Sequence, residues 1–345
     1  MNTYQDIFNK MLYKTVESAD CRLSKAELES CINSSASDFI NETIPEIADT
    51  IVLSLNKESK NHLKLIRDYA DGFVDRNIER WKSGFDALEI FIITCSEIGE
   101  DFNNTNRDRA ARENNVKFDT LVRLHARACH ISSEILWLLK GGFADGAHAR
   151  WRALHEVVVT ALFLSTHENE LSIRYRQHEV VESYKGMTQY NHYEPRLNIV
   201  KFSEEELMEC KLAYEELLSK YGQEFKTSYG WAANVLNNKK PNFFNIEEAV
   251  ELDHFRPYYK WASQNIHANA HGINSKLGLA EAKEDVLLVG ASNSGMTDPA
   301  QLTALSLSQI SVGLLNIYSN IDTLITQHVI EKLKEDIGDL FFKSE

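Results

Sequence analysis

Interruptions to helical periodicity are scarce along this chain. Its 345 residues include only 5 prolines and 15 glycines, the residues that most often end helices and form tight turns. Apolar side chains such as Trp81, Phe85, Leu88 and Cys95 recur three and four residues apart, which places them on one helix face. The sequence therefore predicts an all-α protein, an antiparallel helical bundle, with Glu284–Ser294 as at most one short extended segment.

The chain divides into two predicted parts. Residues 1–70 read as an N-terminal helical extension, in which Ser24 and Glu27 have the spacing of a capping box. Residues 71–345 are expected to form the bundle domain. The length of 345 residues suits two domains, or one large helical domain with an extension.

Within the bundle domain, Gly141 and Gly142 separate two apolar helical patterns, residues 116–139 and 146–165. So short a connection predicts an antiparallel helical hairpin. The polar stretch Asp101–Asn115 has almost no apolar residue and is predicted to be a solvated loop.

Composition restricts the class of protein. The net charge of −14 disfavours nucleic-acid binding unless a local basic patch exists. The five cysteines include no Cys-x-x-Cys pair, which fits reduced thiols in a cytoplasmic protein. The polar N-terminus suggests no signal peptide, and no run approaches about 18 apolar residues, so we expect no membrane span. No cofactor fingerprint or closed metal motif is found, so we expect no cofactor and no metal.

The centre of the chain reverses this acidic balance. Between Arg107 and His155 lie nine basic and five acidic side chains, a net charge of +4, together with four histidines. Such an asymmetry indicates either a functional site or a solvated helix face whose counter-charges lie elsewhere.

The segment His148–Glu156 is the most specific part of this centre. On a helix, His148, Arg152 and His155 share a face, with Glu156 beside them. The apolar residues that follow predict that this helix is buried, and a buried arginine needs partners. The group therefore predicts either a cleft or an internal Arg–Glu network.

Two further polar stripes accompany it. Spacings of four, four, four and three residues predict one helix face for the residues Tyr259, Ser263, His267, His271 and Asn274. Two histidines four residues apart can bind a metal, but no glutamate follows His267 as it does in zinc proteases. Arg174, His178 and Glu182 form the other stripe, which lines the same cleft or faces solvent.

Four segments resemble a bacterial family called domain of unknown function 5677, over about residues 75–280. They are RWKSGFDALEIFIITCSEIGEDFN (80–103), SSEILWLLKGGFADGAHARWRALHE (132–156), RYRQHEVVESYK (174–185) and YYKWASQNIHAN (258–269). The family name implies no activity. A weaker similarity, carried by Arg150 and His155, is to the HEPN helical ribonucleases, whose sites form across a homodimer.

Three hypotheses follow. The first is a metal-independent ribonuclease or nucleotide-cleaving effector of a toxin or phage-defence kind, acting on RNA or an anionic nucleotide. Its predicted catalytic residues are Arg150, Arg152, His155, Glu156 and His267, with an arginine holding the phosphate and a histidine moving the proton. Its predicted substrate-binding residues are His148, Arg174, His178, Tyr259, Ser263 and His271.

The second hypothesis is a non-catalytic binding or sensor module, in which an Arg/His cleft holds an anion. The third is a metal hydrolase that uses His267 and His271. Burial of Arg152 and Glu156 separates the first two hypotheses, and the surroundings of the two histidines test the third.

Overall fold

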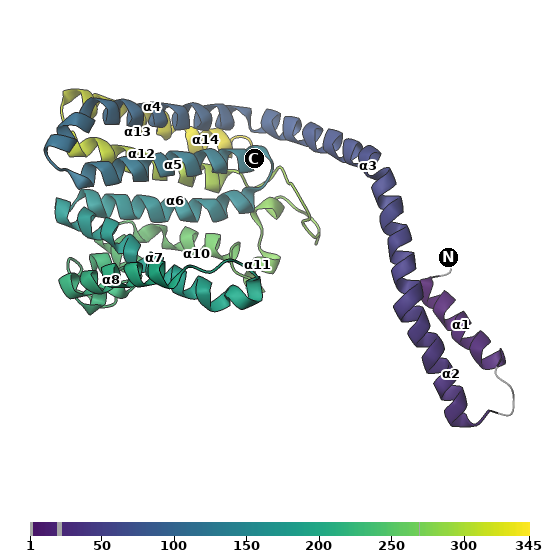
Figure 1. The fold of residues 1–345 in the computed structure, drawn as a ribbon. Helices are drawn as coiled ribbons and strands as arrows, with labels where there is room; N and C mark the ends of the chain where they lie inside the picture. The colour runs from purple at the N-terminus through teal and green to yellow at the C-terminus, as the bar shows by residue number, and fades with distance from the viewer. Residues whose placement is uncertain (1–2, 19–22, 269) are drawn as a thin grey trace. The chain divides into compact units, whose positions relative to one another are not determined.

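The computed structural model describes residues 3–18, 23–268 and 270–345, and it confirms the all-α prediction, with no strand in the described part (Figure 1). The chain forms two compact units, Met1–Phe73 and Val74–Glu345. The N-terminal unit holds α1 (Tyr4–Ser18), α2 (Lys25–Asp38), the π-helical turn η1 (Phe39–Thr43) and most of α3 (Ile44–Arg80). The predicted capping box is confirmed, because Ser24 and Glu27 cap each other at the start of α2.

The core of the C-terminal unit is built from α4 (Lys82–Arg112), α5 (Val116–Lys140), α6 (Ala144–Ser165) and α12 (Thr297–Leu315). Helix α12 packs against the other three, which run side by side in Figure 1. The hairpin of α5 and α6 is confirmed. Its turn depends on Gly142, whose φ of 83° lies in the left-handed region that favours glycine.

The remaining elements cover this core. On the far side of α6 lie α7 (Asn169–Leu197), α8 (Glu204–Tyr221), α9 (Phe243–Ala249) and α10 (Arg256–Gln264), with α11 (Ala270–Asn274) following α10. Short 3-10 turns occur as η2 (Gln223–Lys226), η3 (Gly230–Ala232), η4 (Asp253–Phe255), η5 (Leu277–Leu279) and η6 (Asn316–Tyr318). Helices α13 (Ile321–Glu335) and α14 (Ile337–Phe342) pack on α4 and α12.

One described segment, Thr297–Tyr318, is long and apolar enough to cross a membrane by composition. It comprises α12 and η6, and most of it is buried inside the unit. A buried core helix has the same composition, so this feature is weak evidence for a membrane span.

The predicted loop at Asp101–Asn115 is wrong, because α4 continues to Arg112. Its polar residues form the solvent side of that helix and pair four residues apart, as Arg109 does with Glu113. Phe102 and Ala110 lie on the other side of this helix and are buried.

The segment Glu284–Ser294 contains no strand. No described strand pairs with it, and the side chains of Leu287 and Val289 are exposed.

Candidate functional site

Helix α6 carries the most specific residues of the sequence. It lies with α5 and α12 on one side and α9 and α10 on the other. Trp151 fixes it to α12, since its indole nitrogen donates to the carbonyl of Leu302 at 3.1 Å and to the hydroxyl of Ser306 at 3.0 Å. Arg152, His155 and Glu156 face the other neighbours of α6, since His155 contacts Glu247 of α9 and Glu156 contacts Tyr259 of α10.

Arg152, Glu156 and Tyr259 meet where α6 crosses α10. The Tyr259 hydroxyl donates to Glu156 Oε1 at 2.5 Å, and Arg152 Nε lies 3.3 Å from the same oxygen. Burial, reinforced by the Glu156 carboxylate, raises the pKa of Tyr259 well above its usual value, so the phenol stays protonated and donates. Arg152 and Glu156 are partly exposed and form the accessible edge of the cluster, whereas Tyr259 is buried.

His155 lies behind that edge, in the interior. It is 1% exposed, and its Nε2 lies 3.0 Å from Oε1 of Glu247, which is completely buried. Arg256 binds the other oxygen of Glu247. A buried carboxylate with a guanidinium and an imidazole on its two oxygens is a satisfied network.

The ring of Tyr259 links the edge to the interior. The guanidinium carbon of Arg152 lies 4.7 Å from its centroid and that of Arg256 lies 5.2 Å from it, both within the range of cation–π attraction. The half-buried Tyr229 adjoins this cluster, with its ring 6.3 Å from that of Phe243, and burial, with Glu156 as the next cause, raises its pKa to about 12.

We call Arg152, His155, Glu156, Glu247, Arg256 and Tyr259 the polar network. Its two arginines and two glutamates carry no net charge together. The network can hold α6 against α9 and α10, and it leaves no surplus positive charge for an anion. It corresponds to the internal Arg–Glu network that was one of the two alternatives for this helix.

His148 is buried between aromatic rings. Its ring stacks on Trp151 and meets Trp261 edge-on, at centroid distances of 5.7 and 5.3 Å. Neither ring nitrogen makes a hydrogen bond of ordinary geometry with a described residue. Burial lowers the pKa of His148 to about 4, against the opposing charge of Asp145, so the imidazole is neutral near pH 7.

Arg150 and His155 do not meet. Arg150 lies at the surface and binds Glu134 of α5, with Nε 2.5 Å from Oε2. His155 faces the buried Glu247 instead. The pair that carried the similarity to the HEPN ribonucleases therefore points to two different environments.

The predicted stripe from Tyr259 to Asn274 is broken. Helix α10 ends at Gln264, so Tyr259 and Ser263 share it, but His267 and His271 do not. Both histidines are exposed, and no described contact joins either of them to Arg152. Within the described residues, no three His, Cys, Asp or Glu side chains are grouped so that they could hold a metal ion.

Arg174 lies in a different place from the polar network. It is only 7% exposed, its Nε donates to the carbonyl of Trp231 at 3.2 Å, and its guanidinium lies 4.3 Å from the ring of Tyr221. Among the described residues, no carboxylate oxygen comes within 4.0 Å of it. Burial lowers the pKa of Arg174, with Tyr221 and Glu170 opposing this, but an arginine remains charged.

Arg174 opens into a pocket of about 280 Å³ between α7, α8 and the segment that follows α8. Its two terminal nitrogens make no hydrogen bond with a described residue and are not shielded from the pocket. The rest of the lining is Tyr221, Glu224, Ala233, Asn234, Asn237, Asn238 and Lys239. We call this the Arg174 pocket.

His178 lies one turn beyond Arg174 on α7. Its Nε2 lies 2.9 Å from the carbonyl oxygen of Thr227, and its ring meets Phe225 edge-on. Burial lowers its pKa. His178 thus holds the segment after α8 against α7, next to the pocket.

Reasoning from sequence missed Glu247, Arg256, Tyr229 and Lys239. The first three complete or adjoin the polar network, and Lys239 lines the Arg174 pocket. Each lies in a short helix, turn or loop with no diagnostic spacing. The one indication in the sequence was that the helix around Arg152 is expected to be buried, because a buried arginine needs hydrogen-bonding or charged partners.

Comparison with known proteins gives a family match. The model of a family of unknown function (DUF5677) matches residues 118–285, which span α5 to the segment after η5. This supports the resemblance drawn from the sequence and adds no support for similarity to the HEPN ribonucleases. Neither the curated proteins nor the solved structures contain a match.

Proposed function

We propose that the C-terminal unit is a binding module for a small phosphate-bearing molecule, with the Arg174 pocket as its site. The observation that carries this proposal is Arg174 itself, a residue that is only 7% exposed and whose guanidinium has no carboxylate partner and two terminal nitrogens open to a pocket. A buried charge is costly unless it is paired, and a guanidinium matches the oxygens of a phosphate.

The lining of the pocket suits such a ligand. Arg174 and Lys239 together outweigh the single carboxylate of Glu224 in the lining, and Asn234, Asn237 and Asn238 supply amide groups that can donate hydrogen bonds. Tyr221 stacks on the guanidinium and so limits its orientation. A volume of about 280 Å³ matches a small molecule rather than a polymer.

The ribonuclease hypothesis has less support. It needs a histidine that meets both an arginine and the substrate. His155 is enclosed with Glu247, and His267 lies beyond the end of α10. The metal hydrolase hypothesis lacks a third ligand near His267 and His271 in the described chain.

Calorimetric titration of the full chain tests the proposal, with inorganic phosphate and adenosine monophosphate as probes. The wild type is expected to bind at least one probe saturably. Arg174→Gln should weaken that binding about 100-fold, because a charge-assisted contact contributes roughly 3 kcal/mol. Lys239→Ala, a change at an exposed side chain, should weaken it less.

Arg176→Gln is the matched control, because Arg176 lies two residues along the same helix, is exposed and pairs with Asp119. It should bind like the wild type. Absence of saturable binding in the wild type, or equal binding by Arg174→Gln and Arg176→Gln, contradicts the proposal. Cleavage of RNA by the wild type that is lost in Arg152→Ala would favour the ribonuclease hypothesis instead.

A further inference from the structure

The N-terminal unit has almost no hydrophobic core of its own. Among its described residues, Phe39 is the one buried hydrophobic side chain, in contact with Phe8 of α1 at a ring distance of 5.1 Å. Isolated helices are marginal in water, and most helical stability comes from packing an apolar face. The apolar side chains of this unit therefore need a partner.

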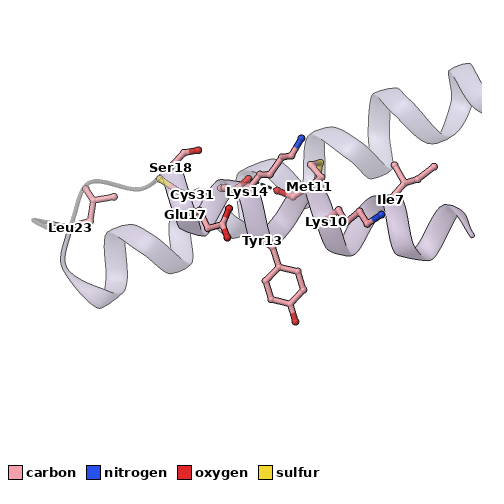
Figure 2. Close-up of a pocket in the computed structure, with 10 residues that line it drawn as sticks. Ile7, Lys10, Met11, Tyr13, Lys14, Glu17, Ser18, Leu23 and Cys31 are labelled. Carbon is pink, nitrogen blue, oxygen red and sulfur yellow. Dashed lines mark hydrogen bonds between the residues drawn. The ribbon is translucent and has the colours of Figure 1, made fainter. Parts of the chain in front are cut away.

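The hairpin of α1 and α2 leaves apolar side chains accessible. Figure 2 shows a groove along these helices, into which Ile7, Met11 and Leu23 contribute apolar surface. A second, more apolar groove is lined by Tyr4 and Phe8 of α1, Phe39 and Ile40 of η1, and the first turns of α3 up to Ile51. The α1 helix therefore covers only the beginning of α3.

A stripe of mostly apolar residues follows along α3. At intervals of three and four residues lie Ile44, Ala48, Ile51, Leu55, Ser59, His62, Ile66, Tyr69 and Phe73. At 1.5 Å per residue this stripe is about 44 Å long. Its large apolar members up to Tyr69 are exposed, and so are Val52, Leu63 and Leu65 beside it.

We infer that this stripe is the interface through which two copies of the chain associate. Eight exposed apolar side chains at roughly 100 Å² each offer about 800 Å² per copy, which is the area that one partner buries in a standard stable interface. This inference concerns the N-terminal unit and does not depend on the proposed function.

The pattern of the stripe fits a second copy. Seven consecutive polar residues, Asn56–His62, interrupt it between a segment of 12 residues, Ile44–Leu55, and one of 11, Leu63–Phe73. We call these two segments the apolar blocks, because their stripe positions are apolar although other positions in them are charged or polar. When two identical helices pair about this interruption, polar segment meets polar segment and apolar block meets apolar block. This holds for both helix directions, and a closed two-fold contact uses the same surface on both copies.

Light scattering coupled to size-exclusion chromatography of the full chain tests the inference. The wild type should have twice the monomer mass of 39.4 kDa. Leu55→Asp and Ile66→Asp should halve the measured mass, because each places a charge in the apolar contact.

Leu53→Asp is the matched control. Leu53 is 70% exposed and Leu55 is 65% exposed, but the two point about 200° apart around the helix. Because both side chains are exposed and belong to the N-terminal unit, neither change removes a buried side chain. Leu53→Asp should keep the wild-type mass. A monomeric wild type, a dimer that survives Leu55→Asp, or equal dissociation by Leu53→Asp each overturns the inference.

Discussion

Glu247 offers a quantitative test of the polar network. It is completely buried, with His155 on one oxygen and Arg256 on the other. Glu247→Ala removes the carboxylate and leaves a partly buried guanidinium and a buried imidazole without a partner. Breaking a buried ion pair in this way costs about 3–5 kcal/mol. Glu247→Gln keeps the shape and a hydrogen-bonding oxygen, and should cost roughly 1–3 kcal/mol, the cost of one unsatisfied buried polar group.

Urea denaturation followed by tryptophan fluorescence measures these costs. All 5 tryptophans lie in the C-terminal unit, so the signal reports that unit alone. The urea concentration at the midpoint of unfolding should fall, while the dependence of the free energy of unfolding on urea concentration stays constant. Glu215→Ala is the control: its exposed pair with Lys211, 3.7 Å apart, contributes at most about 0.5 kcal/mol. Glu247→Ala refutes the reasoning if it lowers the free energy of unfolding by less than about 1 kcal/mol, or by no more than Glu215→Ala does.

Two other predictions concern His148 and Gly230. Burial lowers the pKa of His148 to about 4, so below pH 6.5 the unfolded chain binds a proton that the native chain does not. Stability is therefore lost as the pH falls from 6.5 to about 4, by about 3 kcal/mol for such a histidine, and His148→Phe should reduce this loss in urea titrations at each pH. Gly230→Ala should destabilise the protein by about 2 kcal/mol or more, because the added Cβ would lie 2.4 Å from the carbonyl oxygens of Glu224 and Phe225. Gly186→Ala, with open space around it in α7, should instead raise the thermal midpoint.

The fold was predictable where apolar residues follow helical spacing. The α5–α6 hairpin combines this periodicity with a glycine turn, and both signals agree. The end of α4 was not predictable from its local composition. Arg109 packs over the ring of Tyr318, 4.0 Å away and more than 200 residues along the chain, so tertiary contact stabilises a helix that has a polar sequence.

Only the part of the candidate site that lies on α6 was predictable from the sequence. The sequence singled out Arg152, His155 and Glu156 because one buried helix carries them. Their partners Glu247 and Arg256 lie about 90 residues or more further on, in short helices with no diagnostic pattern. The stripe through His267 failed for a different reason. Polar spacing alone does not reveal that α10 ends at Gln264, because polar residues satisfy both a helix and a turn.

One short segment connects the two groups of polar residues. Tyr229 adjoins the polar network, and Trp231, two residues further on, accepts the hydrogen bond from Arg174. Gly230 between them is pressed against the carbonyl of Phe225, so this backbone has little freedom. Because the network is paired and neutral, whereas Arg174 is charged and open, we assign them different roles. Tyr229 packs on Phe243, which packs on Tyr259 of the network, and the carbonyl of Trp231 holds Arg174 at the wall of its pocket.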